Sequence, residues 1–184
     1  MPKTQVELID NFLVVWDSAD GVQLYKEGYY GKPLGIPKPK IPEFNVPLIL
    51  DLMEGLYLAE QKKIAVYEGA GKKNVGLTNL RQKTRELYSE FEEKYAVYRD
   101  LRDNSLIVTP GIKFGCDFAV YKYGPGVEHA PYMVSVKKQG SDISATEIVK
   151  AGRLATTVRK RFIIAVPDLA GATVKYMIFK WFKA

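Results

Sequence analysis

The chain has 184 residues, of which 47% are hydrophobic and 12% aromatic, so it can fill the cores of one domain or two small ones. No apolar run reaches the roughly 18 to 20 residues of a membrane-spanning helix, the N-terminus lacks a signal-peptide pattern, and we expect a cytoplasmic protein without membrane contact. The single cysteine, Cys116, excludes an internal disulfide and argues against zinc or redox chemistry, and the net charge is +6.

The first predicted element is a strand over residues 11–16, where Phe, Leu, Val, Val and Trp run together. A turn signal at 17–21 predicts that residues 22–25 form its hairpin partner. The next stretch, 28–47, carries five prolines with lysines between them and predicts an extended loop, because proline fixes φ and removes a hydrogen-bond donor. This insertion is either a spacer or a basic arm that touches RNA or another subunit.

Apolar residues at helical spacing predict a helix over 48–61, and a short strand over 63–68 follows. The glycines in the turn at 69–73 do not match the phosphate-loop pattern, which argues against nucleotide binding there. Residues 78–104 lack glycine and proline and predict two helices or one bent helix.

A stripe of large apolar residues along this helical stretch predicts core packing: Leu87, Phe91, Tyr95 and Tyr98. We place a domain boundary near Phe91. The chain is then an N-terminal α/β domain over 1–91, which carries the proline-rich basic insertion 28–47, and a second domain over 92–184.

The second domain is expected to hold three strands, a helix and two further strands after its first helix: 106–108, 116–123, 132–137, then helix 144–160, then 162–166 and 173–182. Ser144 with Glu147 three residues later predicts a capping box at the start of the helix. This order indicates a mixed α/β domain. The last strand includes Met177, Ile178, Trp181 and Phe182, which leave little for a polar face, so we interpret it as an oligomer interface.

Positive charge is concentrated at the C-terminal end of the chain. Residues 150–184 hold eight Lys or Arg and a single acid, Asp168. Such a surface attracts polyanions through counterion release. Charge alone is equally compatible with a solvated surface of a basic protein.

Cleavage of RNA without a metal requires a base for the ribose 2′-OH, an acid for the departing 5′ oxygen and a cation for the charged phosphorane. His129, the only histidine, lies in a loop with Gly, Pro and Gly and suits the acid. Lys160 suits the cation. Tyr121 suits the base only if Lys122 and Lys160 lower the pKa of its phenol, which is ordinarily about 10.

Each of these residues also has a structural interpretation. Tyr121 can be a cross-strand aromatic and His129 a surface loop residue. Lys160 can complement a helix dipole, and taken alone these interpretations of Tyr121 and Lys160 are the better ones. A metal-dependent DNA nuclease would need clustered carboxylates; Asp117 with Glu128 or Glu147 could be considered, but their spacing matches no metal motif.

The second half of the chain resembles the archaeal tRNA-splicing endonucleases. The residues that carry the resemblance are Tyr98-Arg99-Asp100-Leu101-Arg102, Ile107-Val108, Pro110-Gly111-Ile112-Lys113-Phe114-Gly115, Asp117-Phe118, Val120-Tyr121, His129 and Val158-Arg159-Lys160. The resemblance implies a restriction-endonuclease-like C-terminal domain after a small α/β domain. It also implies cleavage of precursor tRNA at bulge-helix-bulge junctions without a metal or cofactor, leaving a 2′,3′-cyclic phosphate and a 5′-OH.

By the same resemblance, Tyr121, His129 and Lys160 fall on the base, the acid and the cation of the family, and Arg153 on an arginine that holds a flipped base from the opposing subunit. Arg153 can also be an ordinary solvent-exposed helix residue. An alternative within this fold is a non-catalytic RNA-binding or assembly subunit, but such a chain is expected to lack the three catalytic residue types.

Family members built from identical chains carry an acidic loop where this chain has residues 137–142, which are basic with one acid. Like charges dock poorly, so self-assembly is doubtful. The resemblance therefore implies a catalytic subunit that joins a homologous non-catalytic structural subunit in an α2β2 assembly, with a homotetramer as the alternative.

Overall fold

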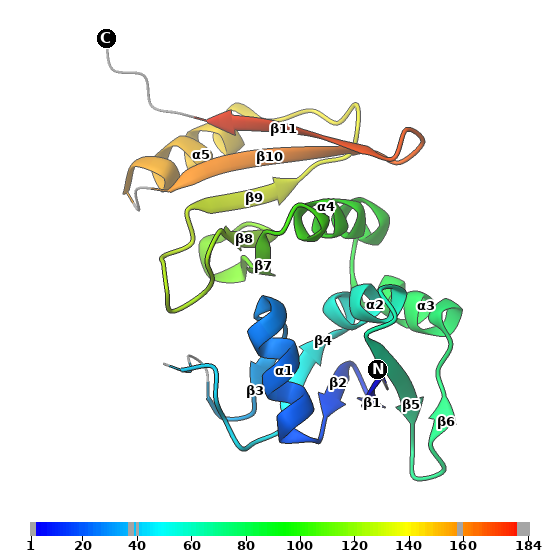
Figure 1. Cartoon of the computed structure of the whole chain (residues 1–184). Coiled ribbons are helices and arrows are strands. Elements are labelled where there is room, and N and C mark those ends of the chain that lie inside the picture. Colours follow the sequence, from blue (N-terminus) through cyan, green and yellow to red (C-terminus); the bar gives the residue numbers. More distant parts are fainter. Residues whose placement is uncertain (1–2, 37–38, 40, 158–159, 180–184) are drawn as a thin grey trace. The chain divides into compact units, whose positions relative to one another are not determined.

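Two β-sheets organise the chain, one in each of the compact units Met1–Phe91 and Glu92–Ala184 (Figure 1). The structure is a computed structural model, and it describes residues 3–36, 39, 41–157 and 160–179. Within these residues no helix is both long and apolar enough to cross a bilayer. The mixed α/β class expected from the sequence is confirmed.

The first unit contains a sheet with strand order β3-β4-β2-β1-β5-β6, in which only β1 and β5 run parallel. Its elements are β1 (Thr4–Ile9), β2 (Phe12–Val15), α1 (Ser18–Gly28), β3 (Lys32–Pro33), β4 (Leu48–Asp51), α2 (Leu52–Glu60), β5 (Ile64–Glu68), β6 (Lys73–Asn74) and α3 (Leu77–Leu87). Helix α2 packs closely on the sheet: a Cβ on Gly55 would lie 1.9 Å from Leu13 Cδ1. The strands expected at 11–16 and 63–68 are confirmed.

The predicted hairpin between residues 11–16 and 22–25 is wrong. Residues 22–25 belong to helix α1, because the side chain of Asp17 accepts hydrogen bonds from the amides of Ala19 and Asp20 and so starts a helix where a turn was expected. The hairpin partner of β2 is instead β1, on its N-terminal side.

The single helix predicted over 48–61 is also wrong in its first turn. Residues 48–51 form strand β4, and Asp51 then caps α2 in a capping box with Glu54. The insertion 28–47 is mostly irregular where it is described, as expected, although the two residues of β3 pair with β4. Residues 37, 38 and 40 lie outside the described part.

The helical stretch predicted over 78–104 is two helices, α3 and α4 (Phe91–Asp103). The chain turns between them at Glu90, which has a φ of 54°. Phe91, Tyr95 and Tyr98 are buried as predicted, but Leu87 is 45% exposed, because the turn removes it from the α4 stripe.

The second unit contains a sheet with strand order β11-β10-β9-β8-β7, in which only β9 and β10 run parallel. Its elements after α4 are β7 (Ile107–Pro110), the 3₁₀ turn η1 (Ile112–Phe114), β8 (Phe118–Tyr121), β9 (Tyr132–Val136), α5 (Ala145–Thr157), β10 (Arg161–Asp168) and β11 (Thr173–Phe179). The predicted order of a helix, three strands, a helix and two strands is confirmed.

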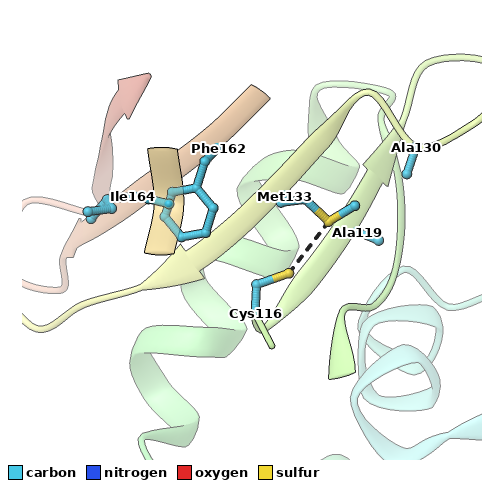
Figure 2. Close-up of a cluster of buried hydrophobic side chains, with 7 residues drawn as sticks. Cys116, Ala119, Ala130, Met133, Phe162 and Ile164 are labelled. Carbon is cyan, nitrogen blue, oxygen red and sulfur yellow. Dashed lines mark hydrogen bonds between the residues drawn. The ribbon is translucent and has the colours of Figure 1, made fainter. Parts of the chain in front are cut away.

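Helices α4 and α5 cover opposite faces of this sheet. On one face Tyr98 of α4 contacts Phe118, with ring centroids 6.0 Å apart. On the other face Ala151 of α5 is fully buried in a cluster with Ala119 and Met133; Figure 2 shows the latter two. Because side chains alternate along a strand, these two faces receive different residues of β8.

The capping box predicted at the start of α5 is confirmed. The amide of Glu147 donates to Ser144 Oγ at 3.2 Å, and the amide of Ser144 donates to the Glu147 carboxylate at 3.0 Å. Helix α5 is described as far as Thr157. Lys160 lies outside any helix, whereas the prediction over 144–160 had included it in the helix. Residues 158–159 and 180–184, which include Trp181 and Phe182, lie outside the described part.

Candidate active site

The register of strands β8, β9 and β10 brings Tyr121 and Lys160 to the same edge of the second sheet, namely the edge formed by the strand ends and not by an outermost strand. Tyr132 of β9 lies opposite Val120 on one side and Arg161 on the other. If this pairing is continued by one residue, Tyr121 and Lys160 lie on either side of Pro131. The amide of Arg161 donates a hydrogen bond to the Pro131 carbonyl at 2.9 Å. With neighbouring strands about 4.8 Å apart, the backbones of Tyr121 and Lys160 are separated by about 10 Å.

Tyr121 and Lys160 also project from the same face of the sheet. Tyr121 follows the buried Ala119 by two residues, and Lys160 precedes the buried Phe162 by two, so each shares the face of that neighbour. Tyr121 packs against the cluster that contains both neighbours. The phenol and the ammonium therefore stand on one side of the sheet, with one strand between them.

The turn at 111–115 supplies a partner for Lys160. Gly111 leaves no room for a side chain, since a Cβ there would lie 2.8 Å from the backbone of Cys116, and Gly115 closes the turn with a φ of 66°. The ring of Phe114 is thereby set against the buried cluster, and Lys160 Nζ lies 4.2 Å from its centroid. This is a close cation–π contact.

Burial sets the electrostatics of this part of the site. The Lys160 side chain is half-buried, and loss of water lowers the pKa of its ammonium. The contact with the Phe114 ring acts in the opposite direction, because it favours the charged form. Cys116 lies in the same cluster, and burial raises the pKa of its thiol to about 11, so it remains protonated at neutral pH (Figure 2).

His129 reaches the same sheet edge from the loop between β8 and β9. It is exposed, and it is followed by Ala130, which is buried in the cluster next to Tyr121. Two glycines with positive φ, Gly124 at 117° and Gly126 at 93°, shape the loop. The Glu128 carboxylate accepts hydrogen bonds from the amides of the two residues that follow Tyr121.

Arg153 lies on α5, away from the helix face that packs on the sheet. It is exposed on α5 and follows the buried Ala151 by two residues. Because two helical residues are about 200° apart around the axis, its side chain leaves the face of α5 that packs on the sheet.

Both halves of the chain match models of the tRNA intron endonuclease family. Residues 4–80 match its N-terminal domain, and residues 91–176 match its catalytic C-terminal domain. The chain belongs to the tRNA intron endonuclease family. A "tRNA-splicing endonuclease" of Hyperthermus butylicus is 46% identical over 170 residues, covering 92% of this chain and 93% of the relative. One of Sulfurisphaera tokodaii is 40% identical over 184 residues, covering 96% and 98%.

The match to the catalytic domain contains Tyr121, His129, Arg153 and Lys160. The chain is therefore an endonuclease of the tRNA intron endonuclease family, as the resemblance implied, and its relatives named above are archaeal.

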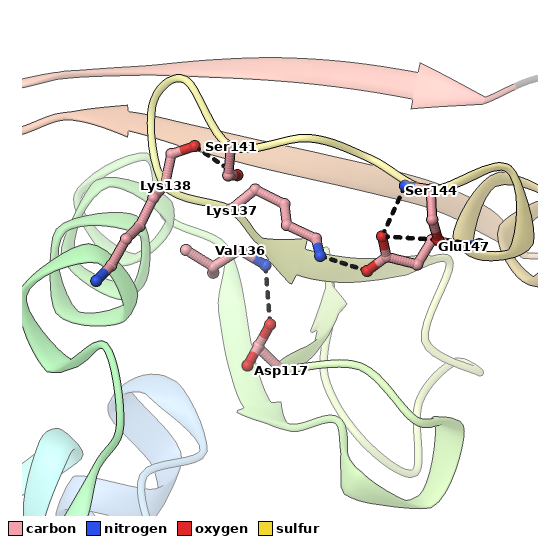
Figure 3. A network of polar contacts seen from close by, with 7 residues as sticks. All are labelled: Asp117, Val136, Lys137, Lys138, Ser141, Ser144 and Glu147. Carbon is pink, nitrogen blue, oxygen red and sulfur yellow. Dashed lines mark hydrogen bonds and ion pairs between the residues drawn. The ribbon is translucent and has the colours of Figure 1, made fainter.

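Two of the three carboxylates weighed as metal ligands, Asp117 and Glu147, make their contacts elsewhere in this tRNA intron endonuclease. Asp117 binds Lys94 at 3.2 Å and the amide of Val136 at 2.8 Å, at the end of β8 away from Tyr121. Glu147 binds Lys137 and caps α5 (Figure 3). Within the described residues, no three His, Cys, Asp or Glu side chains gather as a metal site would require.

The two lysines of the loop at 137–142 are paired within the domain. Lys137 forms an ion pair with Glu147 (Figure 3). Lys138 Nζ lies 3.7 Å from the carboxylate of Glu93 of α4. Their charge is thus partly balanced before any partner arrives. This pairing weakens the argument that like charges prevent the loop from docking in a basic pocket of an identical chain. The loop nevertheless carries only one acid, Asp142, in its sequence.

Strand β11 forms an edge of the sheet and exposes apolar side chains on both faces. Met177 is 52% exposed and Ile178, on the opposite face, is 46% exposed. The sequence pattern had predicted such a strand and its coverage by a partner.

Two residues that shape the site were not assigned a role from the sequence. Phe114 was noticed only as part of a motif, and Glu128 only as a metal ligand. Their contacts depend on folding: Phe114 meets Lys160 across the sheet, and Glu128 turns back to the amides of Lys122 and Tyr123. The available signals were the adjacency of Glu128 to His129 and the two glycines that flank the Phe114 turn.

Proposed function

We propose that this cytoplasmic enzyme cleaves precursor tRNA at bulge-helix-bulge junctions by metal-independent transesterification. The products are a 2′,3′-cyclic phosphate and a 5′-OH. The observation that carries the proposal is the row formed by Tyr121, Pro131 and Lys160 at one sheet edge, with His129 two residues before Pro131. Membership of the tRNA intron endonuclease family and the names of the relatives support the substrate.

In the proposed reaction Tyr121 removes the proton of the ribose 2′-OH, and the 2′ oxygen attacks the adjacent phosphorus. The bond from phosphorus to the 5′ oxygen breaks, and the His129 imidazolium donates its proton to that oxygen. Lys160 stabilises the additional negative charge of the phosphorane. Lys160 lies on the Tyr121 side of the sheet, as this role requires.

Arg153 is proposed to bind an unpaired bulge base rather than to act in the chemistry. A guanidinium plane stacks well on the exposed face of an unpaired base. The outward position of Arg153 on α5 suits contact with RNA held by an opposing subunit.

We further propose that the chain is the catalytic subunit of an α2β2 assembly with a homologous non-catalytic partner. The loop at 137–142 offers one acid to a basic pocket, which supports an acidic loop supplied by the partner. The exposed apolar strand β11 is the surface that we expect a subunit contact to cover. An active tetramer formed by the purified chain alone would instead support the homotetramer.

The test is cleavage of a bulge-helix-bulge RNA in excess EDTA, with the purified chain alone and with its partner. We expect cleavage in both bulges, cyclic phosphate on the 5′ product and 5′-OH on the 3′ product. A substrate with 2′-hydrogen at the scissile nucleotide should resist cleavage, because the nucleophile is missing. Cleavage that requires a divalent metal, or that proceeds on the 2′-deoxy substrate, would refute the proposed mechanism.

A further inference from the structure

A single carboxylate connects the two segments that carry Tyr121 and His129. One oxygen of Glu128 accepts hydrogen bonds from the amide of Lys122 at 2.5 Å and from the amide of Tyr123 at 2.6 Å. The donors are the two residues after Tyr121, and the acceptor is the residue before His129. The hydrogen bonds therefore close the loop at 122–128 immediately beside both residues.

The loop needs such a closure. It contains Gly124 and Gly126, both with positive φ, and glycine permits many other backbone conformations. Its main-chain closures include an isolated bridge between Pro125 and Glu128 and two hydrogen bonds to the Gly124 carbonyl, from the amide of Glu128 at 3.1 Å and from that of Val127 at 3.3 Å. Hydrogen bonds to an ionised carboxylate are roughly twice as strong as neutral ones. The two hydrogen bonds accepted by Glu128 are thus shorter than the hydrogen bonds that the Gly124 carbonyl accepts in this loop.

We propose that Glu128 is a positioning residue that holds His129 at the departing 5′ oxygen. The inference rests on the proposed function, because it needs His129 as the acid. Without the carboxylate the loop remains attached to the sheet through the buried Ala130, but the backbone before His129 is released. A displacement of about 1 Å from the reacting atoms can cost roughly 10²-fold in rate. Glu128→Ala should accordingly lower single-turnover cleavage by about 10- to 100-fold and leave RNA binding within a few-fold.

The test uses a substrate in which sulfur replaces the 5′ leaving oxygen. A thiolate is a far better leaving group than an alkoxide and departs without a proton from an acid. If Glu128 acts through His129, then Glu128→Ala and His129→Ala should both be slow on ordinary RNA and should both recover on the sulfur substrate. Tyr121→Phe should not recover, since its defect lies at the nucleophile.

Two further variants separate positioning from folding. Glu128→Gln keeps one oxygen acceptor without the charge, so its defect should be smaller than that of Glu128→Ala. Glu147→Ala is the matched control: Glu147 also accepts a backbone amide in this domain, yet lies away from the site, so its loss should lower stability with little effect on the rate constant. Melting temperatures and RNA binding are measured for every variant.

The outcomes distinguish this inference from the proposed function. The inference is supported if the cleavage rates of Glu128→Ala and His129→Ala both recover on the sulfur substrate. Wild-type rates for Glu128→Ala on ordinary RNA, or a defect that persists on the sulfur substrate while His129→Ala recovers, would overturn it. Failure of the wild-type enzyme to cleave in EDTA would instead refute the proposed function.

Discussion

Replacing Phe114 by leucine should weaken catalysis by moving the Lys160 ammonium. The ammonium lies 4.2 Å from the ring centroid, in a half-buried position. Cation–π contacts contribute about 0.5 to 1 kcal/mol at exposed sites and about 2 kcal/mol when desolvated, so this one is expected near 1 to 2 kcal/mol. If Lys160 must stay at this place to stabilise the phosphorane, the loss corresponds to roughly 5- to 30-fold in rate.

The assay is single-turnover cleavage of a bulge-helix-bulge RNA in EDTA, with RNA binding and melting temperature measured in parallel. Leucine retains apolar contact with the cluster under Phe114, so the fold should persist. Phe114→Tyr is the control that keeps the aromatic ring and should stay within a few-fold of wild type. The reasoning is refuted if Phe114→Leu cleaves at the wild-type rate while Lys160→Ala is impaired, or if the tyrosine variant loses as much as the leucine variant.

Three further predictions concern stability, each followed by thermal or urea unfolding. Asp117→Asn removes the charge that binds Lys94 and should cost about 1 to 3 kcal/mol, whereas an unchanged midpoint would show that the ion pair contributes nothing. Gly55→Ala should cost about 1 to 3 kcal/mol by overpacking against Leu13, despite the better helix propensity of alanine. The double variant Gly55→Ala/Leu13→Ala should lose less stability than the sum of the two single variants, and purely additive losses would contradict the close contact. The hydrogen bond with Lys137, then the hydrogen bond from the Ser144 amide, lower the pKa of Glu147 to about 2, so the stabilisation by the ionised carboxylate is present above pH 4.5 and is lost as pH falls from 4.5 towards 2. The difference in melting temperature between wild type and Glu147→Gln should therefore shrink over that range, and a constant difference would contradict this expectation.

Local signals in the sequence predicted most of the second domain. The capping box of Ser144 and Glu147 fixed the start of α5, and alternating apolar runs located its strands. The first domain was harder to predict because, at two places, the local sequence fits two different structures equally well. Asp17 is a turn residue and also an N-cap, and the apolar run at 48–51 fits a helix until strand β2 pairs with it. At residues 48–51 the pairing with β2 decides in favour of a strand.

The candidate site could be named from the sequence but not assembled from it. Tyr121 and Lys160 each had an ordinary structural explanation, and only the register of β8, β9 and β10 places them on one face. Register joins segments distant in the chain, so no local pattern encodes it. The role of Phe114 was missed for the same reason, because its contact with Lys160 joins distant segments, whereas the contacts of Glu128 lie within one loop whose conformation no sequence pattern indicated.

The measurement that tests the central claim most directly is single-turnover cleavage and RNA binding by His129→Ala, with the partner subunit present. The account holds that this imidazole protonates the leaving oxygen beside Tyr121 and Lys160. It therefore predicts binding within a few-fold of wild type and cleavage slower by about 10²- to 10⁴-fold. Cleavage within a few-fold of the wild-type rate would contradict it.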